Sequence, residues 1–155
     1  MNRGSNPIRI VVADDDADDR MMIKDAFDES KLGNPVDFVE DGVQLMEYLR
    51  REGQYKSLAN QPFPGFILLD LNMPRKDGRT VLREIKESPI LQRIPIIILT
   101  TSKAEEDIIK TYNLGVNSFI CKPVSFDKLV EIVKTVGRYW IEIVALPPEC
   151  QRAAA

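Results

Sequence analysis

Residues 66–78 read FILLDLNMPRKDG, and this stretch decides the fold. Four apolar residues run directly into a carboxylate, Asp70, and turn-forming residues follow it. A short apolar run bounded by turn residues predicts a strand buried on both faces, as in a parallel sheet. The strand should stop where the charge begins, because an unpaired buried carboxylate is very costly. We therefore expect Asp70 at the carboxyl end of a central strand, the edge where open α/β sheets bind ligands.

The rest of the chain alternates between apolar runs and segments with helical spacing. Further strands are expected at 8–13, 36–40, 95–101 and 117–121. Helices are expected at about 16–33, 41–53, 78–88, 102–115 and 125–145. This alternation predicts an α/β fold, a flavodoxin-like doubly wound sheet of five parallel strands in the order 2-1-3-4-5, with five helices covering both faces.

Several helix ends carry sequence signals. Asp16 is expected to cap the first helix, and Gly33 to end it in a left-handed conformation. Ser102 and Glu105 have the spacing of a capping box at the start of the fourth helix. The inward positions of that helix are expected to be Ile108, Ile109 and Tyr112.

Composition limits the class of protein. The 155 residues suffice for one domain, and 44% apolar with 29% charged residues is ordinary for a globular chain. A net charge of −3 argues against nucleic-acid binding, and neither a membrane span nor a signal peptide is visible. Two isolated cysteines favour a reduced, cytoplasmic setting. Since the chain has no histidine, Ser-His catalysis and imidazole metal ligation are excluded.

The expected domain organisation is simple. Residues 1–7 form a flexible N-terminus, 8–146 the folded domain and 147–155 a C-terminal tail. The loop 53–65 is longer than the usual connection of about 4–6 residues. It should lie at the amino-terminal edge of the sheet, away from Asp70, and is either a partner surface or a spacer.

Chemically useful side chains follow four of the predicted strands. They are Asp14 and Asp15, Asp70, Thr100 and Lys122. In the order 2-1-3-4-5 the three acids crowd into one crevice, where their mutual repulsion favours a hard cation such as Mg²⁺. A lysine and a hydroxyl facing the same point would polarise a phosphoryl group on Asp70, and aspartate is a known phosphoryl acceptor. Each residue alone has a structural explanation, such as capping or a surface charge, but their convergence favours the site.

With these motifs the chain resembles the receiver domains of two-component response regulators, over roughly residues 8–145. The resemblance is carried by Asp14-Asp15, the LLDLNMPRKDG segment around Asp70, Thr100 and Lys122-Pro123. It implies that Asp70 accepts phosphate from a histidine kinase or a histidine phosphotransfer protein. It also implies direct Mg²⁺ binding by Asp15, Asp70 and the carbonyl of Asn72, with Asp14 acting through water.

The same resemblance assigns further roles. Lys122 would hold a phosphoryl oxygen, and the Lys122–Pro123 bond would be cis. Thr100 would be a switch hydroxyl that turns inward after phosphorylation, and Phe119 the switch aromatic that fills the space it leaves. The surface altered by the switch would be the last two helices and the strand between them.

Within that family the chain is similar to the small response regulators of cyanobacterial phytochromes. The features are the long loop 53–65, the LTTS run at 99–102 and the aromatic pair Tyr139-Trp140. This similarity implies a phytochrome-type kinase as partner. Tyr139, Trp140 and Ile141 are consecutive and cannot all face one core, so we expect an exposed apolar patch and a homodimer. Without a visible output domain, the signal would pass by docking or to a downstream phosphotransfer protein.

Three other classes of protein share some of these features. A haloacid-dehalogenase-like phosphatase would use Asp70 as nucleophile, but Asn72 stands where its general acid should be. A calcium loop at Asp14-x-Asp16-x-Asp18 lacks glycine at its sixth position. A flavin-binding protein of this fold would need a Ser/Thr/Gly-rich loop after the first strand, and the chain has acids there.

Overall fold

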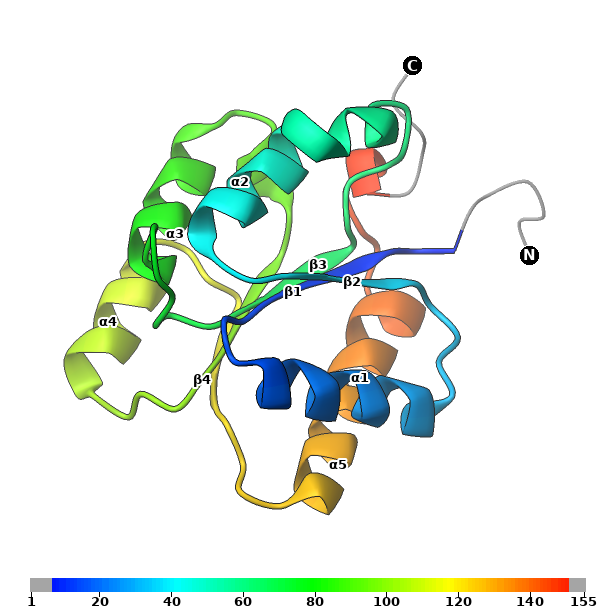
Figure 1. The fold of residues 1–155 in the computed structure, drawn as a ribbon. Helices are drawn as coiled ribbons and strands as arrows, with labels where there is room; N and C mark the ends of the chain where they lie inside the picture. The colour runs from blue at the N-terminus through cyan, green and yellow to red at the C-terminus, as the bar shows by residue number, and fades with distance from the viewer. Residues whose placement is uncertain (1–6, 151–155) are drawn as a thin grey trace.

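Five parallel strands form the centre of the computed structural model, which describes residues 7–150 (Figure 1). The strands are β1 (Ile10–Ala13), β2 (Val36–Val39), β3 (Phe66–Leu69), β4 (Ile96–Thr100) and β5 (Ser118–Cys121). Their order is β2-β1-β3-β4-β5 and every pairing is parallel, so the predicted sheet is confirmed. The predicted flexible segment 1–7 lies outside the described residues except for Pro7.

Helices cover both faces of the sheet. They are α1 (Ala17–Ser30), α2 (Gly42–Arg50), α3 (Gly78–Glu87), α4 (Glu105–Asn113) and α5 (Phe126–Gly137). In Figure 1, α1 and α5 lie together on one side of the sheet, and α2 and α3 lie on the other, with α4 beside α3. Among the described residues the helices are all too short or too polar to span a bilayer.

The alternating side chains of the strands divide the core in two. Ile67 and Leu69 of β3 pack with residues of α2 and α3, whereas Phe66 and Leu68 pack with residues of α1 and α5. All four are buried, as a strand covered on both faces requires. Two-sided burial explains why this strand is a continuous apolar run rather than an alternating one.

Gly78 allows the start of α3 to pack against the backbone of Asp70. A Cβ atom at this position would lie 2.5 Å from the carbonyl oxygen of Asp70 and 2.8 Å from Cα of Leu71. The amide of Gly78 donates to the carbonyl of Leu71 at 2.9 Å. The start of α3 therefore packs directly on the turn that carries Asp70, and a side chain at residue 78 would separate them.

The helix ends agree with the sequence prediction only in part. Asp16 caps α1, accepting from the amides of Asp18 and Asp19. The left-handed C-cap of that helix is Lys31, with φ of 59°, so the assignment of Gly33 was wrong. Gly33 also has positive φ, but it lies two residues farther along, in the connection to β2.

The start and the inward face of α4 also differ from the prediction. The helix begins at Glu105 after Ala104, which offers no side-chain cap, so the Ser102/Glu105 capping box was wrong. Ile109 and Tyr112, expected inside, are exposed, whereas Thr111 is buried. The physical reason for the missing cap is that the Ser102 hydroxyl is engaged elsewhere, by Asp107 of the same helix.

The C-terminal part has two distinct segments. The predicted last helix is interrupted: α5 ends at Gly137 and a π-helical segment, η3 (Arg138–Ile143), follows it. Tyr139 is exposed and Trp140 is partly buried, in line with the expectation that these consecutive residues cannot all face the core. A 3-10 turn, η4 (Pro148–Cys150), then places Cys150 in the core.

The two cysteines lie in opposite environments. Cys150 is buried, and its burial raises the pKa of the thiol to about 12. Cys121, the last residue of β5, is exposed.

Within the described part of the chain, two connections between helices and strands contain 3-10 helices. The long connection after α2 contains η1 (Gly53–Leu58), and a shorter 3-10 helix, η2 (Leu91–Arg93), precedes β4.

Candidate functional site

Three carboxylates meet where β1 and β3 end side by side. Ala13 pairs with Leu69 in the parallel register, so Asp14 and Asp70 leave neighbouring strands at the same level. One oxygen from each of Asp14, Asp15 and Asp70 lies within 4.8 Å of the others. Asp14 and Asp70 are buried, whereas Asp15 is exposed. The structure thus brings together the three acids that the sequence placed at one sheet edge.

The two oxygens of Asp70 have different partners. Oδ1 accepts a hydrogen bond from the Thr100 hydroxyl at 2.7 Å and a longer one from the backbone N–H of Asn72 at 3.3 Å. Oδ2 accepts from Nζ of Lys122 at 3.1 Å. Since Thr100 is fully buried at the end of β4, its hydroxyl is held in place against the carboxylate. Asp70 is therefore oriented by groups from two other strand ends.

Lys122, which follows β5, contacts three carboxylates. Its Nζ lies 2.6 Å from Oδ2 of Asp14, 2.7 Å from Oδ2 of Asp19 and 3.1 Å from Oδ2 of Asp70. The lysine side chain is only 11% exposed. Asp19, the partner that sequence analysis did not name, belongs to the first turn of α1.

Burial and charge act in opposite directions on these groups. Burial alone would lower the pKa of Lys122, but hydrogen bonds to Asp14 and Asp19 outweigh it and raise that pKa well above its usual value. Burial raises the pKa of Asp14, and the hydrogen bond from Lys122 offsets this only in part. The site therefore holds a permanent ammonium beside carboxylates that one positive charge does not fully stabilise.

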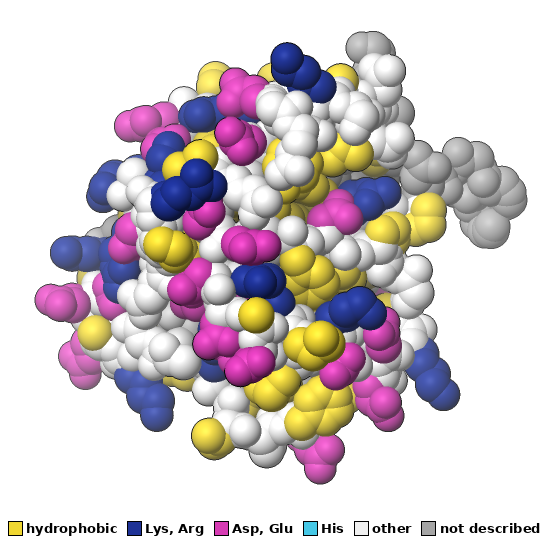
Figure 2. Space-filling model, in the orientation of Figure 1, with side chains coloured by type: hydrophobic (Ala, Val, Ile, Leu, Met, Phe, Trp, Pro, Cys, Tyr) yellow, Lys and Arg dark blue, Asp and Glu magenta, His cyan; other side chains and the backbone are white. Residues whose placement is uncertain are grey.

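An open hollow of about 600 Å³ gives solvent access to this site. It is lined by Asp15, Asp16, Ala17, Asp18, Asp19, Asp70, Asn72, Thr101 and Lys122. On the face shown in Figure 2, acidic side chains gather over the region where α1 begins. A small ligand can reach Asp70 from this side without any rearrangement of the core.

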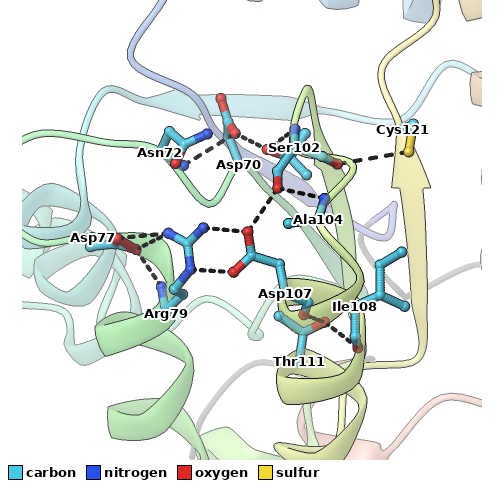
Figure 3. Close-up of polar contacts among 11 residues, drawn as sticks. Asp70, Asn72, Asp77, Arg79, Ser102, Ala104, Asp107, Ile108, Thr111 and Cys121 are labelled. Carbon is cyan, nitrogen blue, oxygen red and sulfur yellow. Dashed lines mark hydrogen bonds and ion pairs between the residues drawn. The ribbon is translucent and has the colours of Figure 1, made fainter.

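A chain of hydrogen bonds leads from Asp70 to α3 and α4 (Figure 3). The Thr100 hydroxyl, bonded to Asp70, also accepts a long contact from the Ser102 amide at 3.4 Å. The Ser102 hydroxyl donates to Oδ2 of Asp107 at 2.7 Å. Asp107 in turn accepts two hydrogen bonds from the guanidinium of Arg79, at 2.8 and 2.7 Å.

Arg79 also binds Asp77, the residue that caps its own helix α3. Its guanidinium donates to both oxygens of Asp77. The hydrogen bonds from Arg79 lower the pKa of Asp107 to about 2. One guanidinium thus ties the first turn of α3 to the first turn of α4, and through Ser102 to the loop that follows Thr100.

Three further expectations concern single residues. Asn72 lines the hollow, and its backbone N–H donates to Asp70. Phe119 lies on β5, partly buried against the core, and its amide donates to the Tyr112 hydroxyl. The Lys122–Pro123 bond is trans, so the predicted cis bond was wrong; trans is the ordinary form even before proline.

A comparison with protein families decides the identity. The model of the response regulator receiver domain matches residues 10–134. The chain belongs to this family. A receiver domain is a phosphoacceptor module of two-component signalling, and this chain is accordingly a signalling protein.

Individual relatives lie within the phytochrome branch of the response regulators. The chain is 40% identical to response regulator Rcp1 of Synechocystis sp., over 95% of this chain and 99% of that protein. Its fold matches the crystal structure of the phosphorylated cyanobacterial phytochrome response regulator RcpA with a TM-score of 0.83 and 42% identity, covering 92% and 99% of the two chains. The Mn²⁺-bound form of Rcp1 matches with a TM-score of 0.81 and 38% identity, covering 91% and 99%.

The donor set of this receiver domain suits a hard divalent cation. Asp14, Asp15 and Asp70 supply carboxylate oxygens, and the acidic cluster they form is typical of a receiver metal site. Asp15 is exposed on the hollow, so a partly hydrated ion can reach it. Burial raises the pKa of Asp14 by disfavouring its charged form, and a cation there would favour that form again.

Sequence reasoning missed Asp19, Arg79 and Asp107. Asp19 lies in the first turn of the helix that Asp16 caps, close in the chain to Asp14 and Asp15, and this was an available signal. The pairing of Arg79 with Asp107 had no sequence signal, because the residues are 28 positions apart on different helices.

Proposed function

We propose that this receiver domain accepts a phosphoryl group on Asp70 from the phosphorylated histidine of a phytochrome-type histidine kinase, in the cytoplasm and with Mg²⁺. The proposal is supported by the similarity to RcpA, which is named as a cyanobacterial phytochrome response regulator. The observation that carries it is the position of Asp70, a nearly buried carboxylate whose Oδ2 meets Lys122 at an open hollow.

The chemistry requires a carboxylate nucleophile, a positive charge and a positioned hydroxyl. An oxygen of Asp70 attacks phosphorus, the P–N bond to the kinase histidine breaks, and an acyl phosphate forms while the imidazole nitrogen keeps the electron pair and takes a proton. Lys122 binds one phosphoryl oxygen, and the Thr100 hydroxyl donates to another. Both groups already contact Asp70, so little reorganisation is needed.

The residues that would hold the cation are Asp14, Asp15, Asp70 and the backbone carbonyl of Asn72. When bound, the ion neutralises charge on the phosphoryl group and on the carboxylates around it. Asp15 and Asp70 are proposed as direct ligands and Asp14 as a ligand through water, as the resemblance to receiver domains implies.

The switch proposed for this protein uses Thr100 and Phe119. The hydroxyl of Thr100 already points to Asp70, so it need not rotate inward to reach a phosphoryl oxygen. Phosphorylation would add about −1.5 to −2 charge beside it and draw the loop after β4 toward the site. The response would be read on α4, β5 and α5, where Phe119 is only partly buried.

The proposed partners are the kinase, a second copy of the chain and a downstream phosphotransfer protein. Tyr139 and Ile143 of η3 are 51% and 66% exposed, and Ile109 and Tyr112 of α4 are 59% and 48% exposed. Exposed apolar residues of this size often mark an interface. Light scattering should give the mass of a dimer, and Ile143→Glu should give a monomer; a monomer in the unmodified protein would contradict the dimer.

Phosphotransfer from a phosphorylated phytochrome-type kinase tests the main proposal. Asp70→Asn should abolish Mg²⁺-dependent labelling, because an amide is a poor nucleophile. The matched control is Asp127→Asn, an exposed carboxylate on α5, which should be labelled as the unmodified protein is. Labelling that persists in Asp70→Asn would refute the proposed acceptor. Steady turnover of a phosphate ester without accumulation of label would instead indicate a haloacid-dehalogenase-like phosphatase.

A further inference from the structure

The three N–H donors of Lys122 are matched by three carboxylate oxygens. An ammonium group has three donors and no acceptor, and here Asp14, Asp19 and Asp70 each place one oxygen within 3.1 Å of Nζ. The lysine side chain is 11% exposed, so water has little access to replace a lost partner. Each carboxylate therefore matters to where the ammonium lies.

Two of these three partners are shared with the candidate cation site. Asp14 and Asp70 belong to the cluster whose oxygens lie within 4.8 Å of one another, and Asp19 does not. A divalent ion at that cluster would compete with the ammonium for the oxygens of Asp14 and Asp70, and the two positive charges would repel each other. Asp19 is the partner that the ion leaves free.

The position of Asp19 is set by the start of α1. Its amide donates to Oδ1 of the N-cap residue Asp16 at 3.1 Å, which holds the first turn against the hollow. The carboxylate is 29% exposed and reaches Lys122 from 103 positions away in the chain. It lies at the wall of the hollow, on the side formed by α1.

We propose that Asp19 is a positioning residue, which retains the Lys122 ammonium on the α1 side of the hollow when a divalent cation takes Asp14 and Asp70. In that position the ammonium lies farther from the cation, so the repulsion between the two positive charges is weaker, and the ammonium stays within reach of a phosphoryl group on Asp70. The inference rests on the proposed function, because the cation and the phosphoryl group are those of the phosphotransfer reaction.

The neighbouring residue provides a matched control. Asp18 lies in the same first turn of α1, lines the same hollow and is exposed. Its amide also donates to Oδ1 of Asp16, but no ion pair to Lys122 is present among the contacts of the described residues. Asp18→Asn and Asp19→Asn therefore change the net charge equally, and only Asp19→Asn removes a partner of Lys122.

The test is a calorimetric titration of the full chain with Mg²⁺, without any phosphodonor. Asp19→Asn should weaken Mg²⁺ binding about tenfold, because the ammonium then rests on Asp14 and Asp70 alone. Asp18→Asn should weaken it no more than about twofold, as a screened surface charge does. Asp19→Glu keeps the carboxylate and should bind Mg²⁺ as the unmodified protein does. Asp19→Ser serves as a second removal of the carboxylate.

A double-mutant cycle with Lys122 separates positioning from simple charge. In the Lys122→Met background, Asp19→Asn should weaken Mg²⁺ binding only as much as Asp18→Asn does. Equal effects of Asp18→Asn and Asp19→Asn in the unmodified background would overturn the inference, and so would a tenfold effect of Asp19→Asn that persists without Lys122. Since no phosphoryl group is present, a failure of phosphotransfer in the unmodified protein would refute the proposed function separately.

Discussion

Two ion-pair clusters of this molecule differ in how completely each cation satisfies its carboxylates. In the Lys122 cluster, one ammonium contacts Asp14, Asp19 and Asp70, and Asp15 lies beside them. In the Arg79 cluster, one guanidinium faces two carboxylates, Asp77 and Asp107. Both clusters sit at helix starts on the same edge of the sheet, yet only the first opens on the hollow.

The difference separates a site that can take another ligand from one that is complete. A planar guanidinium donates two parallel hydrogen bonds to Asp107, and the pKa of that acid falls to about 2. In the Lys122 cluster the pKa of Asp14 is raised by burial in spite of the lysine. The Lys122 cluster has four carboxylates for one ammonium, whereas the Arg79 cluster has two carboxylates for one guanidinium. The larger surplus of carboxylate charge is the property that lets a cation bind.

The largest expected effect comes from removing the cation of the first cluster. Lys122→Met leaves two buried carboxylates without their counter-ion and should lower the free energy of unfolding by about 3 kcal/mol in metal-free solution. Added Mg²⁺ should recover most of this loss, as followed by urea unfolding. Lys128→Met, at an exposed lysine of α5, is the control and should change little. A loss that Mg²⁺ does not reduce would show that the surplus charge is not what the ion relieves.

Removing the Arg79 guanidinium should lower the stability less than removing Lys122 does, and it should leave the affinity for Mg²⁺ unchanged. Arg79→Gln breaks the link between α3 and α4 and should cost about 1–2 kcal/mol, because the pair is partly solvated. The Mg²⁺ affinity measured by calorimetry should stay within about twofold of the unmodified protein. The exposed Arg83 of the same helix is the control, as Arg83→Gln. A strong drop in Mg²⁺ affinity in Arg79→Gln would mean that the two clusters are coupled.

Replacing one acid in each cluster should change the free energy of unfolding in opposite directions at neutral pH. The pKa of Asp107 is about 2 in the folded state, below the ordinary 3.8, so its stabilisation is present above about pH 4 and is lost as the pH falls toward 2. Asp107→Asn should therefore cost about 1–2 kcal/mol at pH 6 and almost nothing at pH 2. Urea unfolding at several pH values measures this. A pH-independent cost would contradict the ion pair with Arg79.

The same substitution at Asp14 should act in the opposite direction. Because burial raises the pKa of Asp14, the folded state disfavours its charged form, and the cost appears as the pH rises above the ordinary 3.8. Asp14→Asn should stabilise the metal-free protein at neutral pH and lose this advantage in acid. A lower free energy of unfolding for Asp14→Asn at pH 7 would contradict this, because it would mean that Lys122 fully compensates the burial of the Asp14 carboxylate.

The smallest expected effect concerns the link between the two clusters. Ser102→Ala removes the hydroxyl that donates to Asp107 and should cost about 0.5–1 kcal/mol, the ordinary value of one hydrogen bond. Ser57→Ala, in the exposed η1 segment, is the control. An unchanged stability in Ser102→Ala would mean that Arg79 alone satisfies Asp107.

The central part of the fold was predictable because burial on both faces leaves a clear pattern. The apolar run that ends at Asp70 predicted a strand covered on both faces, and the parallel direction of the strands then placed Asp14, Thr100 and Lys122 at the same edge. These are consequences of topology, which does not depend on how any helix is rotated. The acidic cluster and the lysine could be found for this reason.

What the sequence could not show depends on helix rotation and on contacts between helices. The capping box failed because Asp107 takes the Ser102 hydroxyl, and Asp107 is itself held by Arg79 from another helix. Ile109 and Tyr112 have helical spacing but face solvent, because α4 packs through Thr111 instead. Local patterns predict such details only when no distant side chain competes for the same group.

The unequal environments of the two thiols make the protein suitable for labelling at one position. A maleimide reacts with thiolate, so Cys150, buried and with a pKa of about 12, should be inert while the exposed Cys121 is modified. The dye would be attached one residue before Lys122, without any engineered mutation. Its emission would then report on ammonium movement, ion binding and phosphoryl transfer in the same sample.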